Sequence, residues 1–283
     1  MIKLFLVSFA SEDLKRSKIR FLRQANEMNI YEGIKIFSYS DLIDEKKQQI
    51  KNFFKKNQKR LFGYGSWKAT IIKSYLEQIP KDSILQYSDV GCHFNKKGID
   101  RLKDYAKLCD KNNILAFQYK KPDFNNYPKL KFQEYFEYEY TKGDLYRYLQ
   151  IKDDSLLLKS QQIWSGTMFF KNNKFTKELL NEWVKVLNIS NLIDDSKSQS
   201  KNHNKFIEHR HDQSAFSLLC KKNNILTLSA SECEWGEVNG ARTWEHLSHN
   251  PIHAKRDKEY NLFKRFINRQ KKNLKRMFEN AKN

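Results

Sequence analysis

A carboxylate follows directly on an apolar stretch that is typical of a buried β-strand. Residues 84–94 read ILQYSDVGCHF, and Asp89 comes just after the apolar run. Two interpretations are open: Asp89 and Gly91 form an ordinary turn, or Asp89 binds a ligand at the carboxyl end of a central strand, where open α/β sheets bind their ligands. Carboxylate oxygens suit Mg²⁺ or Mn²⁺ bridging two phosphates. One carboxylate is too few for a tight site, so other ligands must come from elsewhere.

Two further segments offer groups for a metal ion or a phosphate. HNPIHAKRDK contains His253 and Lys255, an imidazole and an ammonium close in sequence; the alternative is an ordinary exposed segment. GYGSWKATIIK places Trp67 and Lys68 at the start of a predicted helix. Free N–H groups there, together with a cation, can bind an anion. The alternative is a buried aromatic ring beside a solvated lysine.

A dense polar cluster stands before an apolar helical run in FIEHRHDQSAFSLL. Its members are Glu208, His209, Arg210, His211, Asp212 and Gln213. Such side chains can line a pocket for hydroxyl-rich substrates. Asp212 alone could instead be a helix N-cap, although capping does not explain its polar neighbours.

The segment QQIWSGTMFFKNN places Trp164 and Ser165 before Gly166 in an apolar, strand-like run. An aromatic face beside a hydroxyl group can hold a sugar ring. A core tryptophan that packs closely against a glycine is the other interpretation.

Strand-length apolar runs alternate with helix-period segments along the 283 residues. We predict strands at 3–10, 33–40, 83–90, 113–119, 162–171 and 225–230. We predict helices at 12–28, 41–54, 67–79, 176–187 and 212–224. This order predicts an α/β fold with an open, mostly parallel sheet flanked by helices. Segment 122–140 is aromatic and contains two prolines, so we expect a long loop or an edge strand.

Composition limits the partners and the compartment. The 53 Lys and Arg against 33 Asp and Glu leave a formal charge of +20, which favours phosphates, nucleic acid or anionic lipid as partners. The four cysteines form no C-x-x-C pair, which argues against zinc and favours a reducing cytoplasm. The apolar stretch in the first residues is too short for a signal peptide or a membrane span, and we expect it to form a strand.

Taken together, the motifs resemble a known family. GYGSWKATIIKSYL, DSILQYSDVGC, YTKGDLYRYL, QIWSGTMFFK and FIEHRHDQSAFSLL, in this order, resemble small bacterial GT-A glycosyltransferases, distantly similar to retaining galactosyl- and glucosyltransferases. The resemblance covers residues 1–255 and implies a GT-A, Rossmann-like catalytic domain. It implies transfer of a hexose or N-acetylhexosamine from a UDP-linked donor to a glycan or lipid-linked glycan, in bacterial surface polysaccharide such as lipopolysaccharide or capsule.

The resemblance also implies roles for individual residues. YSDVG aligns with the Asp-x-Asp motif that binds metal and donor; Asp89 matches its first carboxylate, and Gly91 stands in place of the second. Mn²⁺ or Mg²⁺ would bind to Asp89 and His253. The nucleotide sugar would contact Ser8, Phe9, Ala10, Ser11, Lys68, Ser88, Asp89 and Lys255. Asp212 and Gln213 would act at the transferred sugar, and Trp164, Ser165 and His211 would bind the sugar or the acceptor.

Stereochemistry stays open at this point. A retaining enzyme needs an amide or carboxylate below the anomeric carbon, whereas an inverting one needs a base at the acceptor hydroxyl. Gln213 and Asp212 fit retention slightly better, yet His211 or Asp212 could equally act as the base.

The last segment, 256–283, has apolar residues at helical spacing and carries ten basic and three acidic residues. Such a helix either packs its apolar face on the catalytic domain or lies on anionic lipid, which would make the protein cytoplasmic and peripheral on the inner face of the membrane. Two other functional classes stay open. The positive charge and the lysines among the aromatic residues of 120–140 favour a nucleic-acid-binding protein. However, acidic residues interrupt that segment and no nucleic-acid-binding motif is present, so we expect no nucleic acid as a partner. Gly91 is compatible with a non-catalytic carbohydrate-binding protein that has a decayed transferase site.

Overall fold

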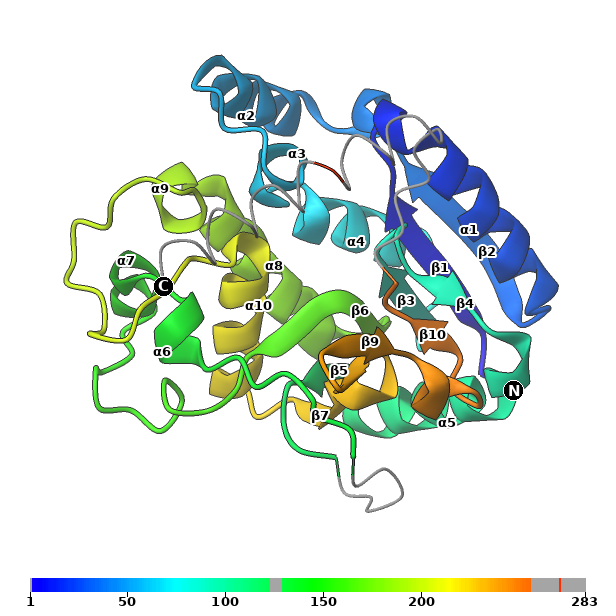
Figure 1. The fold of residues 1–283 in the computed structure, drawn as a ribbon. Coiled ribbons are helices and arrows are strands. Elements are labelled where there is room, and N and C mark those ends of the chain that lie inside the picture. Colours follow the sequence, from blue (N-terminus) through cyan, green and yellow to red (C-terminus); the bar gives the residue numbers. More distant parts are fainter. Residues whose placement is uncertain (1, 123–128, 256–269, 271–283) are drawn as a thin grey trace.

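The centre of the protein is a six-stranded sheet in the order β2-β1-β3-β6-β5-β7 (Figure 1). The computed structural model describes residues 2–122, 129–255 and 270. The strands are β1 (Leu4–Phe9), β2 (Tyr31–Phe37), β3 (Ile84–Ser88), β5 (Ile114–Gln118), β6 (Ile163–Lys171) and β7 (Leu226–Ser229). All six predicted strands are confirmed.

One strand runs against the other five. β1 pairs parallel with β2 and β3, and β5 pairs parallel with β7, whereas β6 is antiparallel to both β3 and β5. The prediction of a mostly parallel sheet is therefore confirmed, with β6 as the exception. Because β6 is reversed, its beginning lies beside the carboxyl ends of its neighbours: Thr167 pairs with Ser88, and Ile163 with Gln118. Trp164 and Ser165 thereby come to the edge where ligands are expected.

Helices cover both faces of the sheet. The main ones are α1 (Lys15–Glu27), α2 (Asp44–Lys55), α4 (Lys68–Leu76), α5 (Ile99–Asn112), α8 (Lys174–Asn188) and α10 (His211–Lys222). Apolar residues of α4, α8 and α10 join one core with one face of the sheet, and residues of α1 and α5 join a second core. The predicted helices are confirmed within a few residues at their ends, whereas α5 was not predicted.

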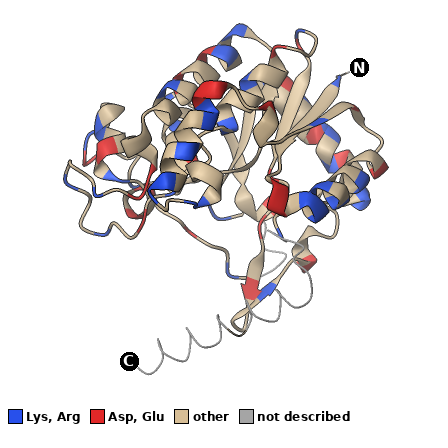
Figure 2. Ribbon diagram, turned by 90° about the horizontal axis from the view of Figure 1, so that it is seen from above, with Lys and Arg blue, Asp and Glu red and all other residues tan. Residues whose placement is uncertain are grey.

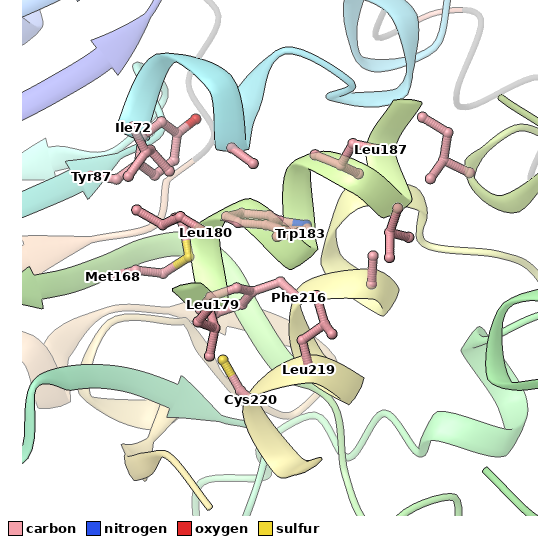
Figure 3. Packing of buried hydrophobic residues seen from close by; sticks show 14 of the residues in the cluster. Ile72, Tyr87, Met168, Leu179, Leu180, Trp183, Leu187, Phe216, Leu219 and Cys220 are labelled. Atoms are coloured by element: carbon pink, nitrogen blue, oxygen red, sulfur yellow. The ribbon is translucent and has the colours of Figure 1, made fainter. Parts of the chain in front are cut away.

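The first core fixes α8 and α10 relative to β6 (Figure 3). The Trp183 ring of α8 lies 4.7 Å from the Phe216 ring of α10, centroid to centroid, and both side chains are fully buried. The apolar residues of α8 recur at helical spacing, which is why one face of this helix is buried. The beginning of α10, with its polar cluster, is thereby held at the edge of the sheet.

Several short α-helices and strands lie between or after these elements. They are α3 (Leu61–Tyr64), α6 (Glu137–Tyr140), α7 (Gly143–Tyr148), α9 (Ser190–Ile193), β4 (His93–Phe94), β8 (Gly236–Val238), β9 (Ala241–Thr243) and β10 (Ile252–His253). In segment 122–140, which we predicted to be a loop or an edge strand, residues 129–136 form only isolated bridges and α6 follows. The predicted basic tail, 256–283, lies outside the described residues except for position 270.

Basic residues lie on several surface helices, with fewer acidic residues among them (Figure 2). All four cysteines are buried. None of the helices in the described part of the chain has the length and apolar character that a membrane span needs.

Candidate active site

A buried lysine connects the two carboxylates that the sequence singled out. Lys68 Nζ lies 2.7 Å from Asp212 Oδ2 and 3.5 Å from Asp89 Oδ1. Lys68 is the first residue of α4, Asp89 follows β3, and Asp212 is in the first turn of α10. Burial by itself lowers the pKa of Lys68, but the charges of Asp212 and Asp89 outweigh burial and the pKa lies above its ordinary value. The ammonium group therefore stays charged at neutral pH.

Neighbouring side chains orient both carboxylates. Ser165 donates its hydroxyl to Asp212 Oδ2 at 2.9 Å, and Tyr87 donates its hydroxyl to Asp89 Oδ1 at 2.6 Å. The carboxylate of Asp212 thus bonds to Ser165 and Lys68, and no side-chain cap bond occurs at the start of α10, so the N-cap alternative is wrong. The two contacts of Asp89 engage Oδ1, and the side chain is 47% exposed, which leaves Oδ2 accessible to a ligand.

An unusual turn precedes Lys68. Leu61, Phe62, Gly63, Tyr64 and Gly65 all have φ between 49° and 85°, so α3 is a left-handed turn. The three non-glycine residues each cost roughly 1–2 kcal/mol in this conformation. Aromatic packing offsets this cost: the Phe62 ring lies 5.5 Å from that of Phe9, and the Tyr64 ring 4.6 Å from that of His211.

Position 65 requires glycine for a second reason. A Cβ at this position would lie 2.6 Å from Asp212 Oδ1. The left-handed turn therefore brings the backbone of residue 65 directly onto the carboxylate that pairs with Lys68. Gly65 was not among the predicted site residues, although two glycines within three residues before a helix are a signal for such a turn.

A hydrogen bond to a buried amide fixes the orientation of Gln213. Gln162 is fully buried, and its Nε2 donates to Glu137 Oε2 at 3.0 Å and to Ser214 Oγ at 3.1 Å. A carboxylate only accepts hydrogen bonds, so the amide nitrogen of Gln162 must face Glu137. The carbonyl oxygen of Gln162 then accepts from Gln213 Nε2 at 2.8 Å. Gln213 consequently turns its own carbonyl oxygen away from this network.

The residues predicted to contact the nucleotide lie mostly inside the protein. Ser8, Phe9, Ala10, Ser11 and Ser88 are all buried. Ser8 Oγ donates to the Ser88 carbonyl at 2.6 Å, which joins the ends of β1 and β3, and Phe9 stacks on Trp67 at 3.9 Å. Trp67 is thus a core aromatic, as one interpretation predicted, whereas Lys68 is paired rather than solvated. Contact of these five residues with a nucleotide stays a prediction.

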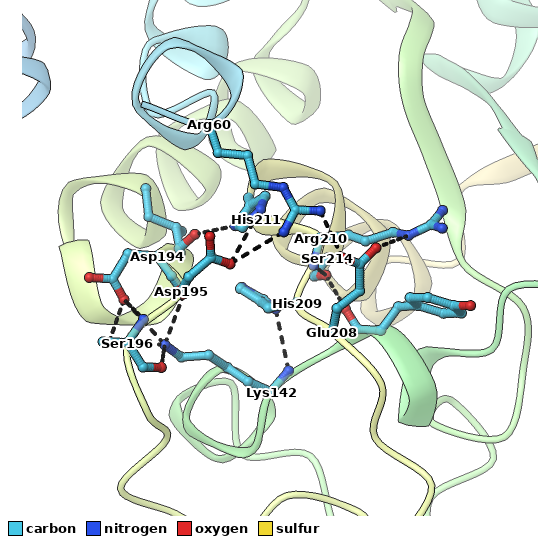
Figure 4. Close-up of polar contacts among 12 residues, drawn as sticks. Arg60, Lys142, Asp194, Asp195, Ser196, Glu208, His209, Arg210, His211 and Ser214 are labelled. Atoms are coloured by element: carbon cyan, nitrogen blue, oxygen red, sulfur yellow. Dashed lines mark hydrogen bonds and ion pairs between the residues drawn. The ribbon is translucent and has the colours of Figure 1, made fainter. Parts of the chain in front are cut away.

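Trp164 and His211 are also buried. A Cβ at Gly166 would lie 2.1 Å from the Trp164 ring, so this tryptophan packs closely against the glycine. His211 Nδ1 donates to the carbonyl oxygen of Ile193 at 2.7 Å, and Nε2 lies 3.8 Å from Asp195 Oδ1 (Figure 4). Burial lowers the pKa of His211. Their predicted contacts with a sugar or an acceptor are not tested by this arrangement.

His253 has the hydrogen bonding of a metal ligand. Its Nε2 lies 2.8 Å from the Leu247 carbonyl oxygen and 3.2 Å from that of Asn250. Carbonyl oxygens only accept, so Nε2 carries the proton and Nδ1 keeps its lone pair, as in most metal-binding histidines. Burial lowers the pKa of His253, which keeps the ring neutral. Lys255 follows with an exposed side chain.

Among the described residues, no group of three or more His, Cys, Asp or Glu side chains is placed to hold a metal ion. A cation that bridges a bound diphosphate needs only one or two protein carboxylates, because phosphate and water oxygens complete its shell. Asp89 Oδ2 and His253 Nδ1 are chemically suited to such an ion. Each of the two side chains thus has the chemistry of a metal ligand, and their binding of one ion stays a prediction.

No family model and no curated protein sequence matches this chain. Structure comparison returns glycosyltransferases, the class that the resemblance predicted. They include mouse xyloside xylosyltransferase 1 (TM-score 0.43, 8% identity, 82% of this chain and 87% of that chain). A glycosyltransferase involved in glycosylation of the PBCV-1 major capsid has TM-score 0.44 and 11% identity over 89% of this chain and 93% of that one. The galactosyltransferase LgtC, solved with donor and acceptor sugar analogs, has TM-score 0.38 and 12% identity over 81% of this chain and 74% of that one. Similarity at these TM-scores does not indicate an activity. The function is therefore inferred from the residues of the site.

Tyr87 and Gln162, which orient Asp89 and Gln213, were also not among the predicted site residues. Tyr87 belongs to a continuous apolar run, where nothing sets it apart from a core residue. Gln162 offered a weak signal, because an amide at the start of a fully buried strand needs hydrogen-bond partners.

Proposed function

We propose that this protein is a glycosyltransferase that uses a nucleotide sugar. The observation that carries the proposal is the Lys68 ammonium between Asp89 and Asp212 at the carboxyl end of β3, beside Gln213. This is the edge of an α/β sheet where ligands bind. A fixed cation and an accessible carboxylate suit a diphosphate, while the adjacent amide suits a sugar.

Charge balance supports a divalent cation in the complex. One ammonium against two carboxylates leaves a net charge of about −1 beside Lys68, which would repel a diphosphate. Mg²⁺ or Mn²⁺, bound through Asp89 and His253, would neutralise the charge that develops on the leaving nucleoside diphosphate. Lys255 would contribute a further positive charge to the same phosphates.

Gln213 favours retention of configuration in this proposal. Its amide nitrogen is engaged by Gln162, so its carbonyl oxygen is the group left to face the anomeric carbon and stabilise positive charge there. Asp212 is less suited to act as a base, because accepting a proton would break its 2.7 Å ion pair with Lys68. His211 is buried, and its Nδ1 is committed to Ile193.

The donor and acceptor classes follow the sequence resemblance. We propose a UDP-linked hexose or N-acetylhexosamine as donor and a glycan or lipid-linked glycan of a bacterial surface polysaccharide as acceptor. The basic segment 256–283 would hold the enzyme on the inner face of the cytoplasmic membrane, next to such an acceptor.

The test is a screen of the purified chain against UDP-glucose, UDP-galactose and UDP-N-acetylglucosamine, with and without Mn²⁺. We expect slow hydrolysis of one donor and a rise in melting temperature with that donor or with UDP. Absence of both responses for every sugar nucleotide would contradict the proposal. Thermal stabilisation without hydrolysis, even when glycan acceptors are supplied, would favour a non-catalytic carbohydrate-binding protein.

A further inference from the structure

Arg210, two residues before Asp212, has no hydrogen-bond acceptor for its side chain among the described residues. The Arg210 guanidinium carbon lies 3.7 Å from the Tyr135 ring centroid and 4.2 Å from that of Tyr140. The two rings are nearly perpendicular, with centroids 5.1 Å apart, so Arg210 occupies the corner between them. Because the rings are nearly perpendicular, at most one of them can lie parallel to the guanidinium plane. Cation–π contacts of this kind hold the group in place and provide no acceptor for its N–H groups.

These N–H groups are poorly matched by the protein. The nearest carboxylate is Glu208, whose Oε1 lies 3.9 Å from Arg210 Nε, beyond hydrogen-bonding distance (Figure 4). Glu208 is more tightly held by Arg60, at 2.8 Å through its other oxygen. Among the described residues, no side chain or carbonyl group accepts a hydrogen bond from the Arg210 guanidinium, although that side chain is only 20% exposed. A largely buried arginine without an acceptor for its N–H groups is well suited to bind an oxyanion.

Hydrogen bonds connect the backbone of Arg210 with the amide network that holds Gln213. Asp212 bonds to Lys68 and to Ser165 in β6, whereas Gln213 bonds to Gln162, just before β6. The next contact outward is the Tyr140 carbonyl oxygen, which accepts from Gln162 Nε2 at 3.3 Å and from the Arg210 backbone N–H at 3.1 Å. Arg210 is thus connected with Gln213 through Tyr140 and Gln162, whereas the polar contacts of the Lys68 side chain are with Asp89, Asp212 and Ser165.

We infer that Arg210 binds a carboxylate or phosphate group of the acceptor, so that the acceptor is an anionic saccharide. The inference rests on the proposed function, because it takes Gln213 as the position of the transferred sugar. A planar fork of N–H groups recognises both oxyanions in the same way, with two parallel hydrogen bonds. A uronic acid residue and a phosphorylated sugar are the two sources of this chemistry. An anionic group on the donor sugar itself is the competing arrangement.

Direct binding tests the site without requiring turnover. Methyl β-glucuronide and glucose 6-phosphate would be titrated by calorimetry, with methyl β-glucoside as the neutral match, in the presence and absence of UDP. We expect at least one anionic saccharide to bind roughly 10- to 100-fold more tightly than the glucoside, and Arg210→Gln to remove that preference. The anionic saccharide that binds more tightly shows whether the group bound by Arg210 is a carboxylate or a phosphate. Equal binding of all three saccharides would overturn the inference.

Matched variants separate a recognition role from a structural one. Arg147→Gln is the control, because Arg147 also contacts a tyrosine ring, at 5.8 Å, but is paired with Asp153 at 3.0 Å. It should keep the full preference for the anionic saccharide. Arg210→Lys retains the charge but loses the planar fork and should keep only part of it. If Arg210→Gln weakens the glucoside and the anions equally, Arg210 is structural and the inference fails.

The donor arm separates this inference from the proposed function. The rates of hydrolysis of UDP-glucuronate and UDP-glucose would be compared. If the protein prefers UDP-glucuronate and Arg210→Gln abolishes this preference, the anionic group belongs to the donor and the acceptor assignment is overturned. Hydrolysis of a neutral donor without any preference for an anionic acceptor would leave the transferase standing and remove the anion site. If no donor is hydrolysed while anionic saccharides bind through Arg210, the proposed transferase fails and the anion site stands.

Discussion

Lys68 Nζ and Asp212 Oδ2 form a 2.7 Å ion pair in which the two side chains are only 7% and 3% exposed. Removing one partner of such a pair leaves an uncompensated buried charge, which typically costs about 3–5 kcal/mol. The pair also joins the start of α4 to the first turn of α10, so it connects the local structure of two distant segments with the proposed site.

We therefore expect Lys68→Met to destabilise the protein by about 3–5 kcal/mol and to abolish donor hydrolysis. Adding Asp212→Asn should restore most of the stability, because the buried charge is gone while the hydrogen bond from Ser165 can persist. Activity should stay lost in the double variant. Urea denaturation and the hydrolysis assay measure the two effects; a double variant as unstable as Lys68→Met would contradict the assignment of the cost to the unpaired carboxylate.

Gln213→Ala should lower kcat by on the order of 10²-fold and leave the donor KM nearly unchanged, because its carbonyl oxygen is proposed to act only as charge develops on the sugar. Gln78→Ala, in an exposed glutamine after α4, is the matched control and should have no effect. A change confined to the donor KM would assign Gln213 to binding instead.

Removal of the proposed metal ligands should weaken Mn²⁺ binding in the presence of UDP. We expect Asp89→Asn and His253→Gln each to raise the Mn²⁺ dissociation constant by at least about tenfold, measured by electron paramagnetic resonance. Asp100→Asn changes a carboxylate whose side chain is 96% exposed, and it should bind like the unaltered protein. Unchanged Mn²⁺ affinity in both site variants would rule out these two residues as ligands.

Acid should destabilise the protein through its buried histidines. Burial, followed by the charge of His211, holds the pKa of His209 well below its ordinary value, and burial also lowers the pKa of His211. Below a pH of about 6.5 the unfolded chain takes up protons that the folded protein does not, so the free energy of unfolding falls by up to about 1.4 kcal/mol per pH unit for each histidine. This loss continues until the pH reaches the lower pKa of the folded state.

Chemical denaturation at pH 7.5 and 5.5 measures this loss. In His209→Asn the difference between the two pH values should shrink, although the variant is less stable at pH 7.5 because the bonds of His209 to Lys142 and Leu192 are perturbed. His249→Asn, in an exposed histidine, should keep the full difference. An unchanged pH dependence in the His209 variant would show that other groups cause the acid sensitivity.

The basic segment 256–283 should bind anionic membranes. We expect the full chain to co-sediment with vesicles containing phosphatidylglycerol at low salt, and a chain ending at Asp257 to do so much less, because each basic residue near the surface contributes roughly 1 kcal/mol. Neutral phosphatidylcholine vesicles are the control. Equal binding of both chains, or binding of neither, would exclude this segment as the membrane anchor.

The six strands could be predicted from sequence because each is a short apolar run bounded by polar or turn-forming residues, a pattern that is local. The same holds for Asp89 at the end of a strand and for the polar cluster at the start of α10. The left-handed turn at 61–65 was not predicted, since Phe62 and Tyr64 adopt an unfavourable conformation and pack there on Phe9 and His211, which are distant in sequence.

Side-chain partners were decided by the tertiary structure alone. Whether Asp212 caps its helix or pairs with Lys68 depends on where α4 lies, and whether Gln213 is free or held depends on Gln162, 51 positions earlier. The reversal of β6 brings Gln162 and Ser165 to the edge of the sheet that holds Asp89. A hydrophobic pattern indicates which residues are buried. The direction of a strand and the partner of a buried polar group depend instead on the packing of the whole chain. Only that packing determines which charged groups and amides lie within hydrogen-bonding distance in the interior, away from water.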